Sequence, residues 1–118
     1  MGIDYSRQMG RKIATKGSRK SVIRVMDIVY MESSGNLITI YLKDGATDYD
    51  IKPLHEFESE LFDYGFFRIH YHTLVNGRYV TGTDAGERVV MLKEKRLKIS
   101  RRRLKAFNLW ISSNPVTG

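Results

Sequence analysis

The chain has 118 residues, 42% of them hydrophobic, which is enough for the core of one compact domain. It contains no cysteine, which excludes disulfides, thiolate zinc sites and a cysteine nucleophile. No run reaches the roughly 18 apolar residues needed to cross a bilayer, and no signal-peptide pattern opens the chain, so we expect a cytoplasmic protein.

The net charge of +7 is distributed unevenly along the chain. Residues 93–105 hold eight basic residues and one acid, residues 1–25 hold seven and one, and residues 26–92 are acidic overall. This separation favours a polyanion partner that meets the two basic segments rather than the whole surface. The alternatives are a solvated charge run and an anionic membrane, although the basic segments lack the aromatic apolar face of an interfacial helix.

Short apolar runs separated by turn signals follow one another along the chain, a pattern that predicts a mainly β fold. We interpret residues 1–10 as a flexible N-terminal lead-in and residues 11–118 as one domain. Strands are expected at residues 12–15, 21–25, 27–33, 37–42 and 47–51. In the last of these, Thr47, Tyr49 and Ile51 alternate with two aspartates, which predicts one solvent-exposed face.

A short helix is expected to open at Pro53, with Leu54, Phe57 and Leu61 on its inner face and Gly65 beyond its end. Extended segments are then expected at residues 66–70, 73–75, 78–83, 88–92 and 96–99. The last helix is expected to run from Arg101 to about Ser112, with its inner face formed by Leu104, Phe107 and Ile111.

The start of this last helix carries an unusual charge. Ser100 is predicted as its N-cap, and Arg101, Arg102 and Arg103 follow in the turn where the helix dipole favours acidic side chains. Each cation there costs about 0.3–1 kcal/mol at an exposed helix end. Three consecutive destabilising cations indicate that an external anion binds at this turn.

Three blocks of the sequence resemble the LytTR family of DNA-binding domains. They are DIVYMESSGNLITIYLKDG, FFRIHYHTLVNGRYV and RLKISRRRLKAF, in the family's order, and the resemblance runs from about Arg11 to Ser112. It implies a bacterial transcription-regulator domain with an elongated fold of small antiparallel sheets and two short helices. It further implies that loops, rather than a recognition helix, enter successive major grooves of duplex DNA. Tandem repeat sites are expected, bound by a chain that is monomeric when free and paired on DNA.

The resemblance also implies base contacts at three places. They are Asn36, Tyr71 with His72 as a substitute, and Arg102. Asn can contact an adenine edge and Arg can donate to guanine O6 and N7, although Asn36 after a glycine is also ordinary turn chemistry. Phosphate contacts are expected from Lys98, Ser100, Arg101, Arg103 and Lys105.

We expect no enzyme. The sequence lacks a Walker loop, a nucleophile elbow and a zinc-protease helix, and the acids Asp48, Asp50, Glu56, Glu58 and Glu60 alternate or face solvent. His70 and His72 would share one face of a strand, but zinc usually needs three or four protein ligands, so no metal and no cofactor are expected.

The alternative function is an RNA or non-specific single-stranded nucleic-acid binder that uses the same basic ends, and a protein-interaction domain is a third. Phe66, Phe67 and Ile69 would supply stacking in the single-strand interpretation, although a buried role is favoured. Glu32 is expected to be either exposed or paired, with Arg24 or Arg68 as a candidate partner. The sequence does not indicate the target site, the regulated genes, or whether the domain activates or represses. It also leaves open whether the chain is a stand-alone regulator or a fragment lacking a receiver or sensor domain.

Overall fold

The computed structural model describes residues 12–13 and 21–113. The expected first hairpin is present there as β1 (Lys12–Ile13), which pairs antiparallel with β2 (Ser21–Val22). The lead-in predicted over residues 1–10 lies outside the described residues. No helix in the described part is long and apolar enough to span a membrane.

An antiparallel five-stranded sheet forms the centre of the fold, in the order β5-β4-β3-β7-β6. Its strands are β3 (Ile28–Ser34), β4 (Leu37–Leu42), β5 (Thr47–Asp50), β6 (Phe66–His70) and β7 (Thr73–Asn76). The hairpin of β3 and β4 turns at Gly35, whose φ of 60° is a left-handed conformation that glycine adopts without strain. Each of these strands falls where the sequence predicts one.

A second antiparallel sheet has the order β10-β9-β8. Its strands are β8 (Gly82–Asp84), β9 (Val89–Met91) and β10 (Arg96–Lys98). The strand predicted over residues 78–83 starts later than expected, because residues 77–79 form the 3-10 turn η3 (Gly77–Tyr79). The mainly β fold with small antiparallel sheets and two helices is confirmed.

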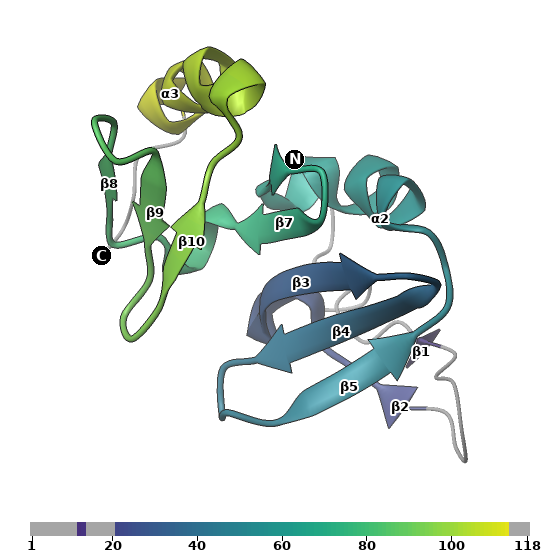
Figure 1. Cartoon of the computed structure of the whole chain (residues 1–118). Coiled ribbons are helices and arrows are strands. Elements are labelled where there is room, and N and C mark those ends of the chain that lie inside the picture. Colours follow the sequence, from purple (N-terminus) through teal and green to yellow (C-terminus); the bar gives the residue numbers. More distant parts are fainter. Residues whose placement is uncertain (1–11, 14–20, 114–118) are drawn as a thin grey trace.

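The two helices lie on different sides of the fold (Figure 1). Helix α2 (Leu54–Leu61) follows Pro53, which occupies the N-cap position rather than the first helical one. The 3-10 turn η2 (Phe62–Tyr64) continues it and ends at Gly65. Helix α3 (Leu104–Ser113) continues from the 3-10 turn η4 (Arg101–Arg103), so the predicted last helix begins with a tighter turn.

The central sheet packs against a hydrophobic cluster on each face, except at β5. On one face Ile28, Met31, Ile38 and Ile40 pack with the inner side of α2, formed by Leu54, Phe57 and Leu61 as predicted. On the other face a second cluster joins the sheet to β9, β10 and α3, and it includes Tyr30, Ile69, Val75, Val90, Leu97 and Phe107. Side chains of β3, β6 and β7 therefore contribute to both clusters.

Strand β5 exposes the face that carries its apolar side chains. Tyr49 and Ile51 are 40% and 59% exposed, whereas Asp50 is buried and its Oδ1 accepts a hydrogen bond from the Lys52 N–H at 2.8 Å. The expectation that Asp50 faces solvent is therefore wrong. Asp50 pairs with Ile38, which lies in the cluster beneath α2, so the helix decides which face is buried.

Asn76, the last residue of β7, connects two segments through its buried amide. Its Nδ2 donates to the Ile28 carbonyl at 2.9 Å, and its Oδ1 accepts from the Arg78 N–H at 3.0 Å. Asn76→Ala leaves these groups without partners, so we expect the free energy of unfolding to fall by about 1–3 kcal/mol. Urea denaturation followed by circular dichroism measures this loss. Asn36→Ala, in an exposed turn, is the control, and an equal loss in the two variants would contradict the expectation.

Candidate nucleic-acid interface

The turn between β6 and β7, formed by Tyr71 and His72, lies beside the end of β3. The Ser33 N–H donates to the His72 carbonyl at 2.9 Å, and Ser33 Oγ lies 3.2 Å from His72 Nδ1. Tyr71 is 69% exposed. These contacts place the β6–β7 turn next to the β3–β4 turn, which carries Asn36.

Asn36, Tyr71 and His72 line one surface hollow of about 370 Å³. The structure therefore brings together two of the three segments predicted to contact bases. The start of α2 and its preceding residues complete the hollow with Lys52 and His55, two basic residues that the sequence interpretation did not select. Lys52 Nζ lies 2.9 Å from Glu60 Oε1, and His55 is exposed.

The turn η4 adjoins strand β6, the strand that leads into this same turn. The Ser100 N–H donates to the Ile69 carbonyl at 2.8 Å, and Arg103 Nη1 donates to the Arg68 carbonyl at 3.2 Å. The third predicted segment is thus joined to β6 just before Tyr71. Because β6 is an edge strand, the arginine-bearing turn lies at the border of the central sheet.

Ser100 takes the backbone conformation of an N-cap, with φ −68° and ψ 148°, but its side chain makes no cap hydrogen bond. Within the described residues its Oγ is buried and has no hydrogen-bond partner. The predicted N-cap position of Ser100 is therefore correct, although its side chain does not cap the turn. With its N–H bonded to Ile69, the phosphate contact of Ser100 stays a prediction that this conformation does not favour.

The three arginines of η4 have different surroundings. Arg101 and Arg102 are exposed, whereas the half-buried Arg103 places Nη1 4.0 Å from Glu58 Oε2. Successive side chains of a 3-10 turn are separated by about 120°, so the three cannot point in one direction. Two of the three guanidiniums therefore face solvent. The other basic residues predicted to contact phosphate, Lys98 and Lys105, are also exposed.

Residues 18–112 match the family model of the LytTr DNA-binding domain. The chain belongs to the LytTR family. The LytTR fold recurs in a solved structure, the LytTr DNA-binding domain of a putative methyl-accepting/DNA response regulator from Bacillus cereus. That structure has a TM-score of 0.73 and 17% sequence identity, and the match covers 86% of this chain and 94% of the other. No curated protein matches the chain. The resemblance inferred from the three blocks is confirmed.

The two phenylalanines of the second signature block pack against the core of the LytTR domain. Phe66 is fully buried, and the Phe67 ring lies 5.5 Å from Phe107 and 5.1 Å from Trp110 between ring centroids. The buried interpretation is confirmed for Phe66 and Ile69, and Phe67 is partly buried against the second cluster. The Phe67 ring contacts other rings of the fold, whereas Tyr71 in the following turn is exposed.

The two histidines near the interface contact each other and the turn backbone. The ring centroids of His70 and His72 lie 5.8 Å apart, and the His72 N–H donates to His70 Nδ1 at 3.2 Å. Among the described residues of this LytTR domain, no group of three or more His, Cys, Asp or Glu side chains is arranged to hold a metal ion.

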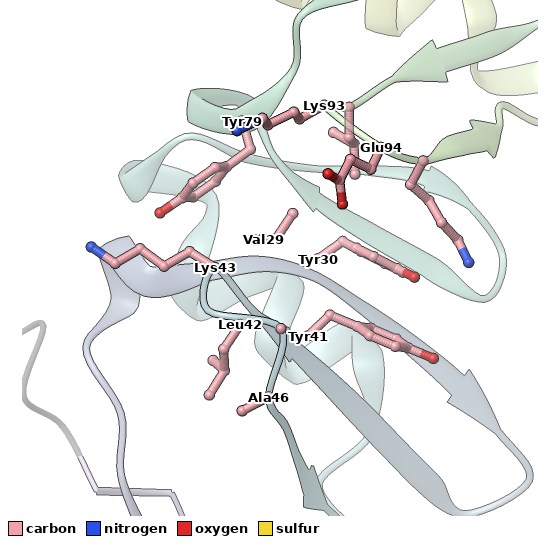
Figure 2. A pocket seen from close by; sticks show the side chains of 12 residues that line it. Val29, Tyr30, Tyr41, Leu42, Lys43, Ala46, Tyr79, Lys93 and Glu94 are labelled. Atoms are coloured by element: carbon pink, nitrogen blue, oxygen red, sulfur yellow. The ribbon is translucent and has the colours of Figure 1, made fainter.

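A larger hollow of about 550 Å³ lies elsewhere on the LytTR domain, between the β4–β5 turn and the β9–β10 turn (Figure 2). Tyr30 and Tyr41 stack there, with ring centroids 4.2 Å apart and 10° between the ring planes. Lysines 43, 93 and 95 stand at its border. None of the residues predicted to contact DNA lines it, so the two hollows are distinct.

The stacked tyrosines make the LytTR domain sensitive to alkaline pH. Burial raises the pKa of Tyr30 and Tyr41 above the ordinary value of 10.0, and the charge of Glu32 adds to both shifts. The folded state favours the neutral form of both tyrosines. Their contribution to the free energy of unfolding is therefore complete below pH 10.0 and is lost as the pH rises through the raised pKa values. Urea denaturation at a series of pH values should show this loss. A loss of the same size in Tyr30→Phe would contradict the assignment.

Proposed function

We propose that this LytTR domain is a sequence-specific duplex-DNA-binding domain of a bacterial transcriptional regulator. The observation that carries the proposal is the continuity of the three segments. Ser33 joins the first turn to His72, and Ser100 joins η4 to strand β6. Side chains on loops can reach outward while the sheets keep the loops in place, which suits reading of groove edges.

The roles follow from exposure and chemistry. Arg102 is exposed on η4 and is proposed to donate to guanine O6 and N7 in one major groove. Asn36, Tyr71 and His72 share the hollow at the two turns and are proposed to contact bases in a successive major groove. Phosphates on either side are assigned to Arg101 and to the two exposed lysines Lys98 and Lys105.

An RNA or single-strand binder is less well supported. Sequence-tolerant single-strand binding uses exposed aromatic side chains on which bases stack, worth about 1–3 kcal/mol per base. Phe66 and Phe67 pack inside the fold instead. A competition experiment separates these functions. Binding to a labelled duplex selected from a random pool is measured in the presence of unlabelled RNA, single strands or scrambled duplex. Competition by RNA equal to that by the selected duplex would contradict the proposal.

Binding to duplex is expected to depend steeply on salt. If the two basic segments, residues 1–25 and 93–105, together neutralise about five or six phosphates, log K should fall against log salt with a slope near −5. Titrations of the selected duplex at several salt concentrations measure the slope, and a value shallower than about −2 would rule out the polyanion partner.

Two copies are proposed to bind tandem repeats about one helical turn apart, from a monomeric free state. Sedimentation of the protein alone and with duplexes carrying one or two repeats tests this arrangement. A tight dimer without DNA would contradict it.

A further inference from the structure

Glu58 of α2 directs its two carboxylate oxygens toward two different arginines. Oε1 lies 3.1 Å from Arg68 Nη1, and Oε2 lies 4.0 Å from Arg103 Nη1. Arg68 belongs to the edge strand β6, and Arg103 belongs to η4. One carboxylate therefore joins a helix, a strand and the arginine-bearing turn at the candidate interface.

Arg68 extends these contacts to the β6–β7 turn. Its side chain is only 13% exposed, and its Nη2 donates to the Tyr71 carbonyl at 2.7 Å. Its guanidinium carbon also lies 5.7 Å from the centroid of the Tyr71 ring. A guanidinium with donors in fixed directions sets the placement of its partners more strictly than a single point charge does.

Arg103 closes the connection from the other side. Its Nη1 donates to the Arg68 carbonyl at 3.2 Å while facing Glu58, and its side chain is 31% exposed. Its guanidinium is thus directed toward the protein, unlike those of the exposed Arg101 and Arg102. The chain of contacts runs from η4 through Glu58 and Arg68 to the Tyr71 backbone.

We propose that Glu58, Arg68 and Arg103 form a positioning network that sets the specificity of the domain for its DNA site. The network holds the β6–β7 turn and η4 in one relative geometry, so that Arg102 and the Tyr71–His72 turn meet their bases together. Binding constellations need placement to within about 0.5 Å, so loosening the network weakens the specific site most. This inference rests on the proposed function, and it makes Arg103 a positioning residue rather than a phosphate contact.

The first test compares Glu58→Gln with Glu60→Gln. Both changes remove one negative charge from α2, and Glu60 pairs with Lys52 instead of with the network. Charge alone predicts that both variants bind every duplex more tightly. The network predicts that only Glu58→Gln lowers the ratio of specific to random affinity, by about tenfold. The ratio of Glu60→Gln should match that of the wild type.

The second test uses Arg103→Lys, which keeps the charge and loses the fork of donors. A phosphate contact would survive this change, with the affinity ratio and the salt slope both unchanged. The network predicts that Arg103→Lys lowers the ratio of specific to random affinity while the salt slope stays unchanged. It also predicts that combining Arg103→Lys with Glu58→Gln adds little to either single change, because both act on one set of contacts.

The outcomes distinguish this inference from the proposed function. A wild-type protein that prefers no selected duplex over scrambled duplex would overturn the proposed function itself. A wild-type protein that discriminates, with equal ratios for Glu58→Gln and Glu60→Gln, would overturn the positioning network alone. Should Glu58→Gln fail to fold by circular dichroism, Glu58→Asp keeps the charge with a shorter reach. Its ratio must then fall as well, and an unchanged ratio would overturn the network.

Discussion

Arg102→Ala is expected to weaken binding to the specific duplex by about 1–3 kcal/mol and to change binding to random duplex far less. Arg102 is exposed, and within the described residues its side chain has no hydrogen bond or ion pair, so truncation should remove the proposed base contact without disturbing the fold. The preference at one base pair should relax at the same time. Binding curves on specific and random duplex across several salt concentrations measure both effects.

Arg101→Ala is the matched control, because Arg101 is the neighbouring exposed residue in the same turn. If Arg101 contacts phosphate as proposed, its truncation should weaken binding to both duplexes about equally and reduce the salt slope by about one. Neither variant should lose stability, since each removes a cation from the positive end of a helix. If Arg102→Ala lowers the affinity for specific and random duplex by the same factor, Arg102 does not contact a base specifically.

Phe107→Ala is expected to lower the free energy of unfolding by about 3–5 kcal/mol. Phe107 is completely buried, and its ring centroid lies 5.5 Å from that of Phe67 and 5.8 Å from that of Trp110. This is a large share of the roughly 5–15 kcal/mol that stabilises a typical domain. Because η4 leads directly into α3, specific DNA binding should weaken as well.

Leu109→Ala on the same helix is the control, since Leu109 is 64% exposed and should change stability by no more than about 0.5 kcal/mol. Urea denaturation followed by Trp110 fluorescence and by circular dichroism measures both variants. If Leu109→Ala and Phe107→Ala lower the free energy of unfolding equally, α3 is not attached to the sheet through Phe107.

The local pattern of the sequence predicted most of the elements and their inner faces. The alternation in β3 and β4, the glycines of the turns and the spacing of Leu54, Phe57 and Leu61 are signals carried by residues close together in the chain. The three signature blocks predicted the family, and the match over residues 18–112 confirms it. Elements were misplaced only at their ends, as at Pro53 and at the start of β8.

The candidate site was predicted in part. The sequence selected the turns with Asn36, Tyr71 and His72, and the structure places these residues around one hollow. It left Glu32 either exposed or paired with Arg24 or Arg68. Glu32 is exposed, with Oε1 3.5 Å from the Tyr41 hydroxyl, and Arg68 pairs with Glu58 instead. Many opposite charges are available in the sequence, and nothing local indicates which pair will meet.

The sequence by itself determined the class of fold, the family and the basic character of the last helix start, because each depends on residue types at short spacing. Only the tertiary structure decided that Asp50 is buried, that the Ser100 hydroxyl caps nothing, and that Arg103 faces the protein. Arg103 contacts a carbonyl 35 residues away in the chain. The direction of a side chain in a turn depends on which surface the turn is packed against, and that surface is assembled by the fold.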